Sequence, residues 1–329
     1  MRKIKLNTSI LIGASLLAAL NFSCSSDDDE DRGNWIERSV FDGVPRSSAA
    51  GFTIMNKGYM GTGYDGDDYL TDFWEYDFDG DYWSQKQDFP GIPRSSAAGF
   101  AANNKGYVGV GYDGDNELED FYAYDTATGW TAIADFGGGV RRSSVSFGVN
   151  NLGYVGTGYD GDNDKKDFWR YNPTTDEWTE LIGFGGDKRR DAVAFTINDN
   201  VYLGTGVSNG LYKEDFWLFD GITESWTRLT DLDDDDDYDI LRSNAVGFSI
   251  NGLGYVTTGY NFSSLASTWE YDPSNDDWEE ITGIEGTARQ DATVFYNEEK
   301  AFVAAGRSGS LYLDDNYELF PQQEYDDED

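Results

Sequence analysis

The sequence repeats one unit six times, and this repetition constrains the fold more strongly than any other feature. Each copy opens with an Arg, followed by small residues and a Phe, and most copies continue into a Tyr beside a Gly-x-Gly run. The six aligned arginines are Arg46, Arg94, Arg141, Arg189, Arg242 and Arg289. Their spacings are 48, 47, 48, 53 and 47 residues. A period of about 40 to 50 residues in segments rich in strand formers indicates a propeller or an array of β-sheets.

Each unit can be divided into four strands. In the first unit, the candidate strands are 48–54, 59–64, 72–77 and 82–87. β-Branched and aromatic residues fill them, and Gly and Asp occupy the turns because they tolerate positive φ. Aromatic residues make up 16% of the sequence, and no long segment has the apolar spacing of an amphipathic helix. Six units of four antiparallel strands predict an all-β fold, a six-bladed β-propeller.

The tryptophans predict how the ring closes. One opens the fourth strand of each of the first five units: Trp83, Trp130, Trp178, Trp226 and Trp278. The sixth unit has no counterpart, but Trp35 lies 48 residues before Trp83 in a similar sequence context. We therefore expect the N-terminal strand to supply the outer strand of the last blade, which would hide sheet edges that are otherwise exposed.

The unit resembles the kelch repeat. Kelch units carry an Arg at the first strand, an aromatic residue before a glycine pair in the second, an Asp and a Tyr-Asp pair in the third, and a Trp in the fourth. In the first unit these places are taken by Arg46, Tyr59, Gly61, Gly63, Asp72, Tyr76, Asp77 and Trp83. The chain departs from the pattern in its Gly-x-Gly spacing and in Ser267, which replaces the Asp of the fifth unit. The resemblance covers residues 35 to about 320 and implies a kelch-type propeller, but no single activity.

The chain contains no histidine, which excludes several chemistries. Kelch-type propellers include the central domain of galactose oxidase, whose copper requires histidine ligands and a cysteine-linked tyrosine, so a copper oxidase is not expected. Nucleophiles that depend on a histidine base are excluded as well. Acid–base catalysis by carboxylates stays open. The family also includes N-acetylneuraminate epimerase, which needs no metal, so a cofactor-free sugar epimerase or mutarotase is the enzyme alternative.

Acidic loops in the first three units are candidate Ca²⁺ sites. Each combines an Asp-Gly-Asp run with a further Asp five residues after the second acid, and oxygen ligands around a flexible glycine suit Ca²⁺. The candidate ligands are Asp65, Asp67 and Asp72, then Asp113, Asp115 and Asp120, then Asp160, Asp162 and Asp167. Asp-Gly is also a common turn pair, so ordinary turns are the alternative. Ca²⁺ is the one cofactor that the sequence suggests.

Strand direction places these loops and the six arginines on one face. A ring of arginines there could bind the carboxylate of an acidic sugar or peptide, since a guanidinium suits bidentate recognition. The structural alternative is that each arginine pairs with a carboxylate of a neighbouring blade. Four aligned tyrosines reach the same face: Tyr64, Tyr112, Tyr159 and Tyr260. They either pack between blades or form a platform on which a sugar stacks.

The N-terminal residues form a predicted export signal. Residues 1–23 combine a basic start with an apolar stretch at 10–20 that is too short to span a bilayer. Cys24 is the only cysteine and follows this stretch directly. The arrangement resembles a bacterial lipoprotein signal, which implies acylation of Cys24; ordinary secretion is the alternative. Residues 24–33 form an acidic tether, which resembles tags that send some gram-negative lipoproteins to the cell surface. Residues 34–321 are the predicted propeller, and 322–329 are an acidic tail.

The formal net charge of −38 limits the partners. Such a surface repels phosphate backbones and anionic lipids, so nucleic acid is not an expected partner and the membrane is reached only through a lipid anchor at Cys24. We expect an extracytoplasmic monomer at the outer membrane or cell surface of a gram-negative bacterium. Its predicted role is recognition of a glycan or a protein through the loop face, rather than catalysis.

Overall fold

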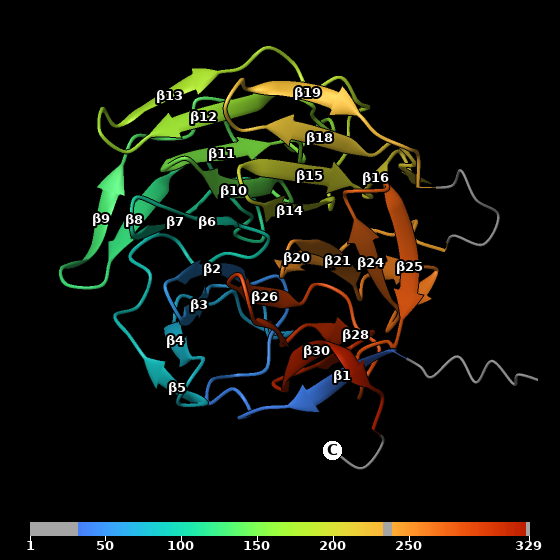
Figure 1. Cartoon of the computed structure of the whole chain (residues 1–329). Coiled ribbons are helices and arrows are strands. Elements are labelled where there is room, and N and C mark those ends of the chain that lie inside the picture. Colours follow the sequence, from blue (N-terminus) through green and yellow to red (C-terminus); the bar gives the residue numbers. More distant parts are fainter. Residues whose placement is uncertain (1–31, 233–238, 327–329) are drawn as a thin grey trace, which may run out of the picture. The chain divides into compact units, whose positions relative to one another are not determined.

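The computed structural model describes residues 32–232 and 239–326. The predicted signal, Cys24 and most of the acidic tether lie outside the described residues. All named elements in the described part are β-strands, and 24 of the 30 form six four-stranded antiparallel sheets around a central channel (Figure 1). This arrangement confirms the predicted six-bladed β-propeller.

Each sheet is one blade, and its strands follow one another outward from the channel. Blade 1 contains β2 (Ala50–Ile54), β3 (Lys57–Gly61), β4 (Phe73–Asp77) and β5 (Tyr82–Gln85). Blade 2 contains β6 (Ala98–Ala102), β7 (Lys105–Gly109), β8 (Phe121–Asp125) and β9 (Gly129–Ile133). Blade 3 contains β10 (Val145–Val149), β11 (Leu152–Gly156), β12 (Phe168–Asn172) and β13 (Glu177–Glu180).

The second half of the ring follows the same plan. Blade 4 contains β14 (Val193–Ile197), β15 (Asn200–Gly204), β18 (Trp217–Asp220) and β19 (Ser225–Arg228). Blade 5 contains β20 (Val246–Ile250), β21 (Leu253–Thr257), β24 (Thr268–Asp272) and β25 (Asp277–Ile281). Blade 6 contains β26 (Thr293–Tyr296), β27 (Ala301–Ala304), β30 (Asn316–Glu324) and β1 (Arg32–Glu37).

Blades 4 to 6 carry an additional short hairpin that sequence reasoning missed. The three hairpins are β16 (Val207–Ser208) with β17 (Leu211–Tyr212), β22 (Tyr260–Asn261) with β23 (Ser263–Ser264), and β28 (Arg307–Ser308) with β29 (Leu311–Tyr312). Each lies between the second and third strands of its blade, where blades 1 to 3 have the Asp-Gly-Asp loops. This face of the ring therefore differs between its two halves.

Strand β1 closes the ring as predicted. It pairs antiparallel with β30, and Trp35 lies opposite Leu319. Trp35 is fully buried, with its indole ring edge-on to Phe248 of blade 5 at 6.3 Å. The indole N–H donates to the carbonyl of Thr282 at 3.2 Å. The two ends of the described chain therefore share one sheet.

In blade 1 the second strand spans Lys57–Gly61 instead of residues 59–64, and the fourth ends at Gln85 instead of residue 87. Two further boundaries also differ from the expected ones. The first strand of blade 1 begins at Ala50 instead of residue 48, because Ser48 has a φ of 54° and leaves the extended conformation. The third strand begins at Phe73, because Asp72 ends the preceding loop and binds Arg46 there. Both departures belong to the connections that shape the loop face.

Aromatic layers between neighbouring blades form the hydrophobic core. In blade 1, the rings of Phe52, Tyr59 and Phe73 lie 5.2 to 5.9 Å apart. Tyr124 of blade 2 packs against Phe73 at 4.8 Å. Gly106 of blade 2 makes room for this layer, since a Cβ there would lie 2.0 Å from the ring of Phe52. Burial of these layers holds the blades, and hence their loops, in place around the channel.

Candidate functional site

The six aligned arginines are fully buried, with an exposed fraction of 0% each. The guanidinium of Arg46 donates to both carboxylate oxygens of Asp72, at 2.6 Å each, and to the carbonyl of Thr62 at 3.0 Å. Blades 2, 3, 4 and 6 repeat this ion pair with Asp120, Asp167, Asp215 and Asp315. In blade 5, Arg242 instead binds the hydroxyl and the carbonyl of Ser267.

These contacts give the arginines a structural role. The partner of Arg46 lies 26 residues further along the same blade, so the expected pairing with a neighbouring blade is wrong. Because none of the six side chains is exposed, the geometry does not support a ligand-binding ring at these positions. Each pair instead fixes the connection into the first strand against the loop before the third.

The acidic loops of blades 1 to 3 form ordinary turns. The carboxylate of Asp65 accepts hydrogen bonds from the backbone N–H groups of Asp67 and Asp68, at 2.9 and 2.7 Å, and the other two loops repeat this arrangement. The third candidate ligand, Asp72, faces its buried arginine instead. Within the described ranges, no group of three or more acidic side chains is placed to hold a metal ion. The geometry agrees with the turn alternative and lends no support to Ca²⁺ sites.

A closed ring of backbone hydrogen bonds surrounds the channel at this face. It is formed by the second residue after each arginine: Ser48, Ser96, Ser143, Asp191, Asn244 and Asp291. Each N–H donates to the carbonyl of the equivalent residue in the preceding blade, at 2.8 to 3.1 Å. All six have φ between 51° and 57°, a region that Asp and Asn tolerate better than most residues. Sequence reasoning missed this ring, although Ser, Asp or Asn at one position of every unit was its signal.

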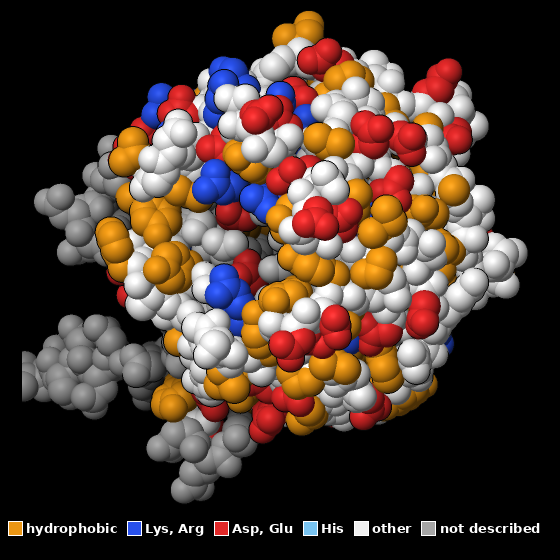
Figure 2. Space-filling view, turned by 180° about the vertical axis from the view of Figure 1, so that it is seen from behind, with side chains coloured by type: hydrophobic (Ala, Val, Ile, Leu, Met, Phe, Trp, Pro, Cys, Tyr) orange, Lys and Arg blue, Asp and Glu red, His pale blue; other side chains and the backbone are white. Residues whose placement is uncertain are grey.

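The ring opens into a cavity of about 370 Å³, which we call the channel mouth. Besides ring residues, it is lined by Arg142, Arg190, Arg307, Tyr64, Tyr69, Tyr112 and Tyr312. Figure 2 shows a hollow in this face with basic side chains at its rim. Arg142 and Arg190 directly follow the buried arginines of blades 3 and 4, whereas Arg307 begins β28 of blade 6.

Two carboxylates of the ring lie among these arginines. Asp291 accepts hydrogen bonds from Nε of Arg307 at 2.9 Å and from the amide of Asn244 at 2.7 Å. Asp191 has an oxygen 3.5 Å from Nε of Arg190. Burial raises the pKa of Asp191 to about 6 and also raises the pKa of Asp291, because the loss of water disfavours the ionised form. The mouth therefore holds acids with raised pKa values beside fixed positive charges.

Replacing Asp191 with Asn should stabilise the protein at pH 7 and flatten the pH dependence of its stability between about pH 4 and 6. The native pKa of about 6 lies above the ordinary value of 3.8. Such a group stabilises the fold fully below pH 3.8 and loses that contribution as the pH rises through 6. Asn fits this backbone conformation, since Asn244 has a φ of 56° at the equivalent place.

Urea unfolding at a series of pH values measures this effect. The matched control is Asp199→Asn, which makes the same chemical change in the exposed turn between β14 and β15. An unchanged profile for Asp191→Asn would show that the Asp191 carboxylate has the same pKa in the folded and unfolded chains.

Tyrosine and arginine side chains form a continuous crescent along the mouth. The rings of Tyr64 and Tyr69 lie 4.9 Å apart, and Tyr69 meets the ring of Tyr112 at 6.1 Å. The guanidinium of Arg142 lies over Tyr112 at 4.5 Å and over Tyr159 at 5.2 Å. These separations suit aromatic and cation–π attraction, so the side chains support one another in fixed positions. We call these residues the tyrosine–arginine crescent.

The crescent crosses the boundaries between blades: Tyr69 of blade 1 meets Tyr112 of blade 2, and Tyr64 meets Tyr312 of blade 6 edge-on at 6.0 Å. These contacts agree with the predicted packing between blades.

The tyrosine rings of the crescent are partly exposed, and their hydroxyls hold the neighbouring loops. Tyr64 donates to the carbonyl of Gly66 at 2.6 Å, and Tyr159 donates to that of Gly161 at 2.6 Å. The buried aromatic layers of the core use other tyrosines, such as Tyr59. The crescent therefore presents anchored aromatic rings to the solvent.

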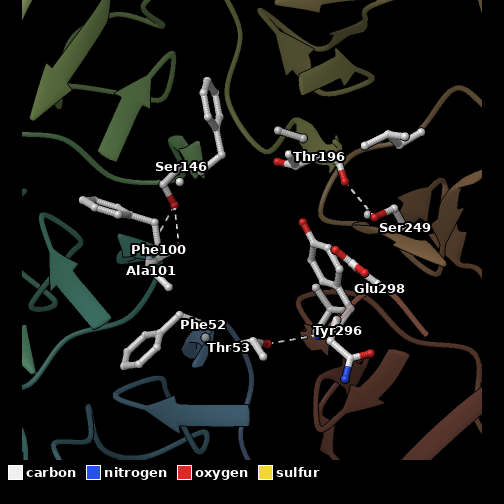
Figure 3. A pocket seen from close by; sticks show the side chains of 18 of the residues that line it. Phe52, Thr53, Phe100, Ala101, Ser146, Thr196, Ser249, Tyr296 and Glu298 are labelled. Atoms are coloured by element: carbon white, nitrogen blue, oxygen red, sulfur yellow. Dashed lines mark hydrogen bonds between the residues drawn. The ribbon is translucent and has the colours of Figure 1, made fainter. Parts of the chain in front are cut away.

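The opposite end of the channel is wider and lacks this basic character. Its cavity of about 730 Å³ is lined mainly by polar and small side chains of the inner strands and their turns, with Tyr296 and Glu298 projecting into it (Figure 3). The hydroxyl of Ser249 donates to the carbonyl of Thr196 at 2.7 Å. None of the described residues that line this cavity is Lys or Arg. The arginines that line the described part of the channel thus lie at the mouth, whereas Glu298 and Glu299 line the opposite end.

The architecture defines the class of protein: the chain is a six-bladed β-propeller. The solved structure of YjhT has a similar fold, with a TM-score of 0.75 and 15% sequence identity, and the match covers 87% of this chain and 99% of YjhT. This similarity shows the fold alone, and 825 solved chains are similar in structure, so the fold does not select a function. No protein-family model and no curated protein matches the sequence. In the described part of the chain, no helix has the length and apolarity needed to cross a membrane.

Proposed function

We propose that this protein is an extracytoplasmic lipoprotein whose kelch-type propeller recognises a glycan at the channel mouth. The observation that carries the proposal is the tyrosine–arginine crescent beside a polar cavity. The signal-like residues 1–23, followed by Cys24 and an acidic segment, support a location at the outer membrane or cell surface. The sixfold recurrence of the kelch-like pattern supports the family assignment.

The chemistry of the mouth suits a sugar. A sugar ring has apolar C–H faces that can stack on aromatic rings, and hydroxyl edges that need donors and acceptors. Asn244 and Asp191 can supply hydrogen bonds, and the guanidinium groups of Arg142 and Arg190 suit the carboxylate of an acidic sugar. The cavity of about 370 Å³ is also large enough for a small ligand.

A glycan-array screen of the purified mature protein, with and without Ca²⁺, tests ligand class and cation dependence together. Acidic glycans should be retained. Arg142→Ala should weaken their binding by about tenfold, because a desolvated guanidinium stacked on aromatic rings contributes on the order of 1 to 2 kcal/mol. Lys105→Ala, at the start of β7 on the opposite face, is the matched control. Retention of no glycan, or equal binding by the Arg142 variant, would contradict the proposal.

A cofactor-free sugar epimerase or mutarotase is the second candidate function. The raised pKa values of Asp191 and Asp291 favour it, because a carboxyl group near its pKa can both donate and accept a proton. NMR of sialic acids and common aldoses separates the two functions. Catalysis predicts anomer exchange faster than in buffer, lost in Asp191→Asn, whereas a binding module predicts exchange at the rate seen in buffer.

A further inference from the structure

On the mouth face, the loops between the second and third strands are acidic in blades 1 to 3, whereas those of blades 4 to 6 present apolar side chains. Where the first three blades have Asp-Gly-Asp loops, the hairpins of the other three present large apolar side chains. These are Leu211 (68% exposed), Phe262 (89%) and Leu311 (56%), which we call the apolar rim. In Figure 2, hydrophobic side chains gather to the left of the hollow, on the side of blades 4 and 5. Leu211 and Leu311 occupy equivalent places, opposite Ser208 and Ser308, and Phe262 forms the turn of the blade 5 hairpin. Exposed apolar residues in the hairpins of three neighbouring blades indicate an interaction surface.

Phe262 shows that this surface is not a by-product of packing. Its φ of 58° lies in the left-handed region, which is rare for a bulky residue and costs roughly 1 to 2 kcal/mol. The turns of the other two hairpins have Asn209 and Gly210, and Gly309, in this conformation, none of which is bulky. The Phe262 ring meets Tyr212 edge-on at 6.3 Å and is otherwise exposed, so burial does not repay the strain. A strained, exposed aromatic side chain points to a role in binding.

We propose that the apolar rim docks a partner protein through a polypeptide segment that is both basic and apolar. Apolar side chains of the segment would cover Leu211 and Phe262, and its Lys or Arg side chains would face the acidic loops across the mouth, such as that of Asp65 and Asp67. Charge complementarity selects this occupant. A chain with a net charge of −38 attracts a basic segment and repels both anionic lipid and a second copy of itself.

Docking at the apolar rim goes beyond glycan recognition. The cavity of the channel mouth is lined by ring residues, arginines and tyrosines, and neither Leu211 nor Phe262 belongs to the described residues that line it. The two surfaces can therefore be altered separately, and a variant of one should leave binding at the other intact.

Selection from a library of random short peptides displayed on phage tests the proposal, with the full mature chain as bait. Enriched peptides should combine Lys or Arg with aliphatic or aromatic residues, and NaCl should weaken their binding. Phe262→Asn, which fits the left-handed conformation, should lower the affinity of these peptides by about tenfold or more, as for a central aromatic anchor. Ile222→Asn is the matched control, since Ile222 is 76% exposed in the turn between β18 and β19, on the opposite face.

The proposal is overturned if no peptide is enriched, or if enriched peptides bind Phe262→Asn as well as the unmodified chain. If the unmodified chain binds phosphatidylcholine vesicles and Phe262→Asn abolishes that binding, the apolar rim binds a membrane instead of a peptide. If sedimentation velocity shows a dimer and Phe262→Asn abolishes it, the apolar rim binds a second copy of the chain. Either result also overturns the proposal. Glycan retention, measured in parallel, should survive Phe262→Asn, so failure of peptide docking is distinguishable from failure of glycan recognition.

Discussion

Trp35→Ala is expected to lower the free energy of unfolding by about 3 to 5 kcal/mol, the usual range for truncation of a buried Trp. The Trp35 side chain is fully buried in the core cluster shared by blades 5 and 6, where it contacts Phe248. Its loss would leave a cavity where β1 meets the rest of the ring. Strand β1 joins blade 6 through its pairing with β30 and through the packing of Trp35. The substitution should therefore also weaken closure of the ring. Urea unfolding followed by circular dichroism measures the change.

Two further variants separate ring closure from loss of side-chain volume. Deleting residues 32–37 removes β1 and exposes an edge of β30, which should promote association through the free edge. Trp130→Ala removes the aligned tryptophan of blade 2, which is partly exposed, and should cost less than Trp35→Ala. A loss below about 1 kcal/mol for Trp35→Ala, the size of an average substitution, would contradict a closing role for β1.

Trp35 also illustrates why the fold could be predicted from the sequence. Because it lies one period before Trp83, the segment around it had to occupy the outer place of a blade, and only the sixth blade lacked that strand. Each blade also repeats the same buried positions, such as Phe52 and Phe100 in the first strand. The sequence therefore specifies the blade six times, and a departure in one unit, such as Ser267, still leaves the architecture predictable from the others.

The candidate site was harder to predict, because spacing does not show where a side chain points. The six arginines recur as regularly as ligand-binding residues would, but only the structure shows that all six are buried, five of them beside a carboxylate of their own blade. The residues that reach the mouth stand one and two places later, as at Arg142 and Asp191, where the residue type changes between blades. A surface for one asymmetric ligand has to differ around the ring. Variation among the units was therefore a better signal for the site than their recurrence.

Replacing Arg46 with Met is expected to cost about 3 to 5 kcal/mol, because it removes one partner of a buried ion pair. The Asp72 carboxylate would lose both guanidinium hydrogen bonds, and the carbonyl of Thr62 would lose its donor. The guanidinium also lies over the ring of Phe41 at 4.9 Å, and that contact would disappear. The double variant Arg46→Met/Asp72→Asn should cost less than the sum of the single changes, since it leaves no unpaired charge. Urea unfolding of the two single variants and the double variant measures these losses of stability. If the loss in the double variant equals the sum of the two single losses, Arg46 and Asp72 are not energetically coupled.

The pH profile gives an independent check on this ion pair. Burial alone would raise the pKa of Asp72, but the hydrogen bonds and charge of Arg46 outweigh it and hold the pKa below its ordinary value of 3.8. A lowered native pKa stabilises the fold above pH 3.8, and this contribution is lost as the pH falls through the native value. Arg46→Met should therefore flatten the acidic end of the stability profile. Asp191→Asn should instead raise the stability at pH 7, and it should flatten the stability profile at higher pH, between about pH 4 and 6.

Blade 5 provides the internal comparison for the arginines. Its Arg242 has Ser267 in place of an aspartate and donates to the carbonyls of Ile240 and Thr258, and burial lowers the pKa of Arg242 to about 10. Arg242→Met should therefore cost less than Arg46→Met, because it leaves no carboxylate without a partner. Equal costs in the two blades would mean that the hydrogen bonds from guanidinium to backbone carbonyls, which both blades share, account for the stabilisation. The aspartates would then add little in the other five blades.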